Sequence, residues 1–184
     1  MPHLLPTEST VGAFLFLTVP LLLIIYLSFL LFIRPPKKVL LASLLGGIIM
    51  GLVNLVVDSV AYYAHWWYYS LKELVLHVPL PFYISPALIF GSLTYLLIWR
   101  FKHGRSHMLS LLLLLGVPLF CIIRDVWGGL THTAYQEWSN GLVATLATIV
   151  MWLVAFYVGF WLFWRTAAHI EPEIVQDGST IRRD

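Results

Sequence analysis

A stripe of small and polar residues runs along the second apolar segment of the chain. Its members recur every three or four residues, the spacing that puts side chains on one face of an α-helix: Ser43, Gly47, Gly51, Asn54, Asp58, Tyr62 and His65. An ionisable residue inside a membrane span is costly and usually faces a protein interior or a wet cavity. Asp58 is therefore the leading candidate for acid–base chemistry.

A basic partner for Asp58 is found in the fourth apolar segment. Counted at about 1.5 Å per residue from the inner ends of antiparallel helices, Asp58 rises about 28 Å and Arg124 about 24 Å. Because charges at such depth normally pair, we expect Arg124 to neutralise Asp58, with Asp125 pointing elsewhere or joining a three-charge cluster. The three residues are the candidate catalytic groups, and a plain ion pair that joins two helices is the alternative.

Aromatic residues gather at the membrane side nearest Asp58, most densely between Tyr62 and Tyr69. Amphipathic rings favour the headgroup region, so a membrane belt explains many of them. A lid or pocket wall over Asp58 is the other interpretation. The candidate ligand-binding residues at this level are Asn54, Tyr62, His65, Trp66, Trp67, Tyr83, Trp127, His132 and Glu137.

Several classes of chemistry lack support in the sequence. The histidines and the acid near Asp58, which are His65, His77, His132 and Glu137, have no recognised metal-ligand spacing, so no metal site is predicted. Cys121 is the single cysteine and cannot form an internal disulfide. A net charge of +2 gives no reason to expect nucleic acid as a partner. No motif identifies a cofactor, which stays unknown.

The elements that must position these residues are membrane-spanning helices. The 184 residues are 60% hydrophobic and 11% charged, with a mean hydropathy of +0.85, which is typical of an integral membrane protein. A helix needs roughly 20 apolar residues to cross a bilayer. Five segments are long enough: Thr10–Ile33, Val39–Tyr63, Phe82–Phe101, Met108–Trp127 and Gly141–Trp164. We predict an all-α integral membrane protein, a five-helix bundle with one domain over 1–168 and a mobile cytoplasmic tail over 169–184.

The basic residues predict an orientation. Of the 11 lysines and arginines, all but Lys72 and Arg124 fall in the first connection, the third connection or the part after the last span. The positive-inside rule makes that side cytoplasmic, so the N-terminus is expected outside and the C-terminus inside. A prokaryotic inner (plasma) membrane is the simplest host, and the lipid bilayer is the first expected partner.

Two packing predictions follow from the pattern of residues. The segment His65–Pro81 places Leu71, Leu74, Val75 and Val78 at helix-like spacings, which indicates a short helix lying on the membrane before its prolines stop it. The fifth span carries a stripe of small and polar residues, namely Gly141, Thr145, Thr148, Trp152, Ala155 and Gly159. Small residues permit close helix approach in lipid, so this face is expected to pack on the Gly47 and Gly51 step of the second span.

The order of an acid, an aromatic cluster and a proline-rich step resembles integral-membrane cyclases of carotenoids and terpenes. The matching elements are Asp58, Trp66-Trp67-Tyr68-Tyr69 and Pro79-Leu80-Pro81. In those cyclases a proline is typically associated with adjacent acidic residues, whereas here Pro81 is followed by Phe82 and Tyr83. The resemblance implies a lipid-soluble isoprenoid substrate, and its generic motifs assign no family.

Two classes of function remain open, and the sequence slightly favours the first. The first is a non-catalytic membrane protein that binds a hydrophobic small molecule, or joins other membrane subunits, through its aromatic outer half. The second is an enzyme of cyclase or isomerase type acting on a lipid or isoprenoid, with Asp58 as acid or base and aromatic faces stabilising positive charge. A small proton-coupled carrier is a weaker third hypothesis.

Overall fold

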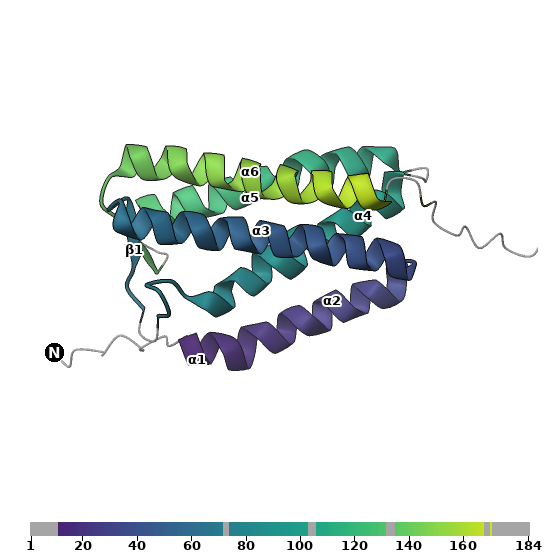
Figure 1. The fold of residues 1–184 in the computed structure, drawn as a ribbon, viewed down its shortest axis with the longest axis horizontal. Coiled ribbons are helices and arrows are strands. Elements are labelled where there is room, and N and C mark those ends of the chain that lie inside the picture. The colour runs from purple at the N-terminus through teal and green to yellow at the C-terminus, as the bar shows by residue number, and fades with distance from the viewer. Residues whose placement is uncertain (1–10, 72–73, 103–105, 132–134, 168–169, 171–184) are drawn as a thin grey trace, which may run out of the picture.

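The computed structural model describes residues 11–71, 74–102, 106–131, 135–167 and 170 of the chain. Its elements, in chain order, are α1 (Val11–Ala13), the π-helix η1 (Phe14–Thr18), α2 (Val19–Ile33), α3 (Lys37–Tyr63), β1 (Trp67–Tyr69), the 3₁₀-helix η2 (Leu80–Tyr83), the π-helix η3 (Pro86–Leu93), α4 (Thr94–Lys102), α5 (His107–Leu130), β2 (Gln136–Trp138) and α6 (Gly141–Ala167). Figure 1 shows the long helices running side by side, with β1 at one end. We call this end the ribbon end.

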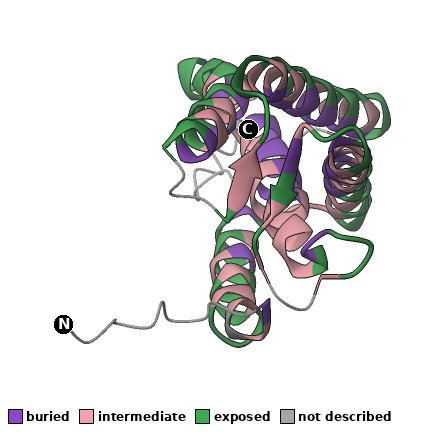
Figure 2. Cartoon of the chain, turned by 90° about the vertical axis from the view of Figure 1, so that its left-hand side faces the viewer, coloured by how far each residue is buried: buried purple, intermediate pink, exposed green. Residues whose placement is uncertain are grey.

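Five helices are long and apolar enough to cross a membrane, as the sequence predicts. They are Phe14–Ile33, Lys37–Tyr63, Leu80–Lys102, His107–Leu130 and Gly141–Ala167, within a few residues of the expected spans. Seen from the ribbon end, buried residues face the inside of the bundle and exposed residues its outside (Figure 2). The exposed residues include large apolar ones such as Phe16, which is 83% exposed, and the buried ones include Asn54 and Asp58. An apolar outside around a partly polar inside fits a multi-pass membrane protein.

The centre of the bundle is α3, which packs on both α6 and η3. At the α3–α6 crossing the backbones nearly touch, because a Cβ on Gly46 would lie 2.6 Å from the carbonyl oxygen of Gly159. This confirms that α6 packs on α3. The expected contact of α6 with the Gly47 and Gly51 step is wrong, since those two glycines face Ala87 of η3 instead.

The first span lies at the side of the bundle (Figure 1). Of its residues from Phe14 to Ile33, only Tyr26 and Ile33 are buried. The Tyr26 hydroxyl lies 2.8 Å from that of Ser92, which in turn lies 3.0 Å from that of Ser43. These hydroxyls link the first three spans by hydrogen bonds that lipid acyl chains cannot form.

Two short strands cap the ribbon end. β1 pairs antiparallel with β2, with Trp67 opposite Trp138, Tyr68 opposite Glu137 and Tyr69 opposite Gln136. The prediction of a membrane-surface helix between the second and third spans is wrong for the described residues, which form β1 and then a tight turn from Val75 to Val78. The reason is that β1 finds a partner strand in the connection between α5 and α6, which the local apolar spacing does not reveal.

Candidate functional site

Asp58 is held at the ribbon end of α3 by three neutral donors. The Trp67 indole Nε1 donates to one carboxylate oxygen over 3.2 Å, and the Tyr69 and Tyr83 hydroxyls donate to the other over 2.8 and 2.6 Å. Asp58 is only 5% exposed. Trp67 and Tyr69 come from β1 and Tyr83 from the end of η2, so the strand pairing and the start of the third span together build this cradle.

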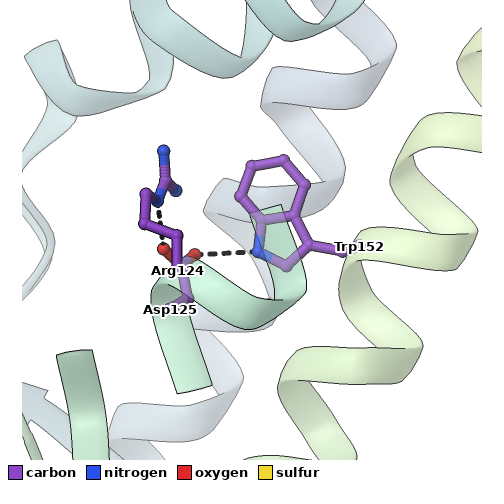
Figure 3. Close-up of polar contacts among 3 residues, drawn as sticks. All are labelled: Arg124, Asp125 and Trp152. Carbon is purple, nitrogen blue, oxygen red and sulfur yellow. Dashed lines mark hydrogen bonds and ion pairs between the residues drawn. The ribbon is translucent and has the colours of Figure 1, made fainter. Parts of the chain in front are cut away.

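The charged pair on α5 is formed by two adjacent residues. Arg124 donates its Nε–H to Asp125 over 2.6 Å, and the second Asp125 oxygen accepts the indole N–H of Trp152 over 2.8 Å (Figure 3). The predicted direct pair between Asp58 and Arg124 is therefore wrong. Arg124 has a carboxylate on the next residue, and the described partners of Asp58 are the three aromatic donors, so neither group needs the other.

The two carboxylates nevertheless face one cavity of about 240 Å³. Its walls come from η1, α3, β1, η2, η3, α5, β2 and α6. The lining residues are Phe14, Asn54, Asp58, Tyr69, Phe82, Ser85, Pro86, Arg124, Asp125, Tyr135, Gln136, Thr148, Met151 and Trp152. Two carboxylates against one guanidinium give this lining an excess of hydrogen-bond acceptors and of negative charge when all three are ionised. The cavity therefore favours a guest with hydrogen-bond donors.

One wall of the cavity carries an unpaired hydroxyl. Thr148 of α6 is 1% exposed, and its Oγ1 has no hydrogen-bond partner among the described residues. Trp138 Nε1 is the other buried side-chain atom of this kind in the described part of the chain. A buried polar group without a partner is costly, so a water or ligand group that reaches the Thr148 hydroxyl would be favoured there.

Two of the residues that line the cavity are exposed at the surface. The Arg124 side chain on α5 is 42% exposed, and Tyr135, directly before β2, is 48% exposed. Arg124 lies six residues before the end of α5, about 9 Å along the helix axis, which is inside the apolar part of that helix. An opening beside Arg124 lies at a level where the outside of the bundle is apolar, whereas one beside Tyr135 lies at the ribbon end. Phe14 of η1 lines the same cavity, so the first span borders it as well.

Burial raises the pKa of Tyr69 well above its ordinary value, and the nearby Asp58 carboxylate raises it further. The Tyr69 hydroxyl therefore keeps its proton at physiological pH and remains a donor to Asp58. A carboxylate surrounded by neutral donors and a carboxylate beside a guanidinium are thus present in one cavity, in two different environments.

The other predicted site residues are spread over separate parts of the molecule. Asn54 lines the cavity and donates its amide to the Met50 carbonyl, whereas Tyr62 and His65 line a separate pocket outside the ribbon. Trp66 lines an apolar groove between α3 and α6, and Trp127 is 68% exposed on α5.

Glu137 lies on β2, where it accepts a hydrogen bond from the Tyr68 hydroxyl over 2.5 Å. His132 lies outside the described residues. The expectation that all these residues meet at one site is thus replaced by a polar cavity and an outer aromatic pocket.

Sequence reasoning missed several cavity residues. Thr148 and Trp152 belong to the stripe of the fifth span, which was interpreted only as a packing face. The sequence did contain a signal for them, because both residues place polar atoms on a face that otherwise carries small residues. Gln136 and Ser85 carried no such signal, because their positions depend on strand pairing and on the π-helix that follows Ser85.

Comparison of the chain with protein-family models, with curated proteins and with solved structures finds no match. The function must therefore be argued from the geometry of this cavity.

Proposed function

We propose that this protein binds the polar end of a hydrophobic small molecule in the cavity between α3, α5 and α6. The observation that carries the proposal is the unpaired, buried Thr148 hydroxyl in a cavity that also contains the Asp58 and Asp125 carboxylates. A cavity used only for helix assembly has no need of a polar lining that includes an unpaired hydroxyl.

The size of the cavity indicates that only one end of the guest molecule enters it. A volume of about 240 Å³ is below the several hundred Å³ usual for a whole drug-sized ligand. The remainder of a lipid-soluble molecule then stays outside the opening beside Arg124, at the apolar level of α5. A lipid or an isoprenoid with a hydroxyl or another donor group at one end fits this division.

The membrane context of the proposal follows from the charges. We place the ribbon end on the outer side and the basic residues, such as Lys37 and Arg165, on the cytoplasmic side, with the N-terminus outside and the C-terminus inside. A prokaryotic inner membrane is the proposed location. The guest would enter from the outer leaflet.

Catalysis on the same guest is the second candidate function. It is favoured by the two carboxylates in one cavity, because Asp58 has only neutral donors while Asp125 is paired with a guanidinium. Two acids in different environments can take opposite roles in proton transfer. Asp58 would be the acid or base in an isomerisation or cyclisation of a lipid or isoprenoid.

The test is to identify small molecules that co-purify with the protein in lipid, by solvent extraction and mass spectrometry. Thr148→Val keeps the shape of the side chain and removes its hydroxyl, and we expect about 2- to 10-fold less bound compound. Thr145→Val is the matched control, because that exposed hydroxyl on the same helix bonds to the Gly141 carbonyl. Equal occupancy in the two variants would refute the proposed binding mode.

The same preparation separates binding from catalysis. Asp58→Asn keeps the size of the side chain and its ability to accept hydrogen bonds, but it cannot take up a proton. If Asp58 does proton chemistry, this variant binds the identified compound and fails to convert it. If the protein only binds, the wild type leaves the compound unchanged as well.

A further inference from the structure

A second pocket, distinct from the cavity at Asp58, lies on the outer face of the ribbon. Its volume is about 520 Å³, and its walls are mostly aromatic. The rings that line it belong to Tyr62, Tyr63, His65, Trp67, Tyr68, Tyr69 and His77. None of the described residues that line the pocket is a lysine or an arginine. A membrane belt needs rings at the surface, but it does not need them arranged around a hollow.

Three of these rings are enriched in electron density by their hydrogen bonds. Trp67 and Tyr69 donate to the Asp58 carboxylate, and Tyr68 donates to the carboxylate of Glu137. A phenol or indole that donates its proton to an anion gains negative charge on its ring. The ring face then attracts a cation more strongly than the ring of a free tyrosine does.

Accordingly, hydrogen bonding to Glu137 and the negative charge of that residue raise the pKa of Tyr68. Tyr68 is 45% exposed, so its ring remains available to a guest.

One wall of the pocket is fixed by a strained turn. Val75 and Val78 exchange two backbone hydrogen bonds, and the two residues between them, Leu76 and His77, have φ values of 54° and 64°. Left-handed conformations at both positions usually require glycine or asparagine, so this turn is held at a cost. The His77 ring stacks on Tyr62 with a centroid distance of 4.0 Å and an interplanar angle of 5°. The stacking keeps Tyr62 in place as part of the wall.

We propose that this outer aromatic pocket binds a quaternary ammonium group. Such a group is large, weakly hydrated and without hydrogen-bond donors, so several aromatic faces around a hollow are its best partners. The group can come from a choline lipid of the surrounding membrane or from a free choline-type solute. The proposal concerns a different cavity from the one at Asp58 and stands without the proposed function, although Tyr69 lines both.

The decisive comparison is between choline and 3,3-dimethyl-1-butanol, which has the same shape without the charge. Binding of each to the full chain in nanodiscs made of phosphatidylglycerol alone is followed by calorimetry and by tryptophan fluorescence. We expect choline to bind about 3- to 30-fold more tightly than its neutral analogue. Equal affinity, or no binding of choline, would overturn the proposal.

Substitutions test whether choline binds in this pocket. Tyr63→Leu removes an exposed wall ring and should weaken choline binding about 3-fold or more, and Glu137→Gln should weaken it while every ring stays in place. Trp161→Leu is the matched control, since that residue is also well exposed, at 57% against 69% for Tyr63, but lies toward the opposite end of α6. Each variant is first checked for a single gel-filtration peak and an unchanged unfolding temperature. If Trp161→Leu weakens choline binding as much as Tyr63→Leu does, the proposal fails.

Competition between lipids and free choline distinguishes the two sources of the quaternary ammonium group. Nanodiscs containing phosphatidylcholine should block binding of free choline if the lipid headgroup is the natural guest, and they should leave it unchanged if the guest is a solute. Phosphatidylethanolamine, whose ammonium is smaller and more strongly hydrated, should compete less than phosphatidylcholine. Stronger competition by phosphatidylethanolamine would count against an aromatic site for a quaternary group.

Discussion

At the scale of single residues, the groups next to a charged side chain determine its partner more than its depth in the membrane does. Asp58 was identifiable from sequence because an acid interrupts an otherwise apolar helix. Its partners were not identifiable in this way. Arg124 pairs with Asp125, the next residue on the same helix, so a similar depth in the membrane does not make it the partner of Asp58. The aromatic donors Trp67, Tyr69 and Tyr83 stood in the predicted outer aromatic cluster. Only the pairing of β1 with β2, together with the position of η2, reveals that they point their polar hydrogens at Asp58.

This arrangement predicts which residues are energetically coupled to Asp58. Tyr83→Phe removes one donor, and since a hydrogen bond to a charged group is worth about 1.5–3 kcal/mol, we expect a loss of stability of that order. In a double-mutant cycle, Tyr83→Phe and Asp58→Asn should show a coupling of about 0.5–3 kcal/mol. Arg124→Gln with Asp58→Asn should show a smaller one. Unfolding in mixed micelles measures all of these, and a larger coupling with Arg124 than with Tyr83 would contradict the observed contacts.

At the scale of elements, the five helices were predictable because long apolar runs can form little else in lipid. The strand pair was not, since three-residue strands leave no periodic signal and their register depends on a distant segment. The same limit explains the error about the glycines. A stripe of small residues predicts a close contact, but it does not say whether Gly47 faces α6 or η3.

The close approach of α3 and α6 gives a prediction about packing. In Gly159→Ala the new Cβ would lie 2.5 Å from the carbonyl oxygen of Gly46 and from the Tyr95 hydroxyl. Overpacking of this kind costs about 1–3 kcal/mol, so the variant should unfold more easily. Gly116→Ala on α5 is the matched control, because its nearest neighbour, a Leu112 methyl, is at 3.9 Å. Thermal unfolding in detergent compares them, and equal stability of the two variants would show that the crossing is looser than described.

At the scale of the whole molecule, the chain buries a few polar residues within an apolar core and exposes an apolar surface. The five spans were predictable from the apolar runs of the sequence, whereas the cavity was not, because it needs residues from most of the elements at once. Phe14 from the first span and Gln136 from β2 meet there although the sequence separates them widely. The candidate site in this fold therefore arises from the meeting of distant segments rather than from a motif.

The orientation in the membrane is a separate prediction. A reporter fused after Asp184 should be cytoplasmic and one fused before Met1 external, because the basic residues gather on one side of five spans. Paired alkaline phosphatase and fluorescent protein fusions measure the two ends independently. Both ends on the same side would be incompatible with five spans.

The central claim is that the cavity at Asp58 holds the polar end of a lipid-soluble guest. The most direct measurement is a high-resolution electron microscopy structure of the protein in its native lipid, with a bound antibody fragment to aid alignment. We predict continuous density from the opening beside Arg124 into the cavity, ending within hydrogen-bond distance of the Thr148 hydroxyl and of Asp58. A cavity closed by a direct contact between Arg124 and Asp58, with no density beside Thr148, would contradict the claim.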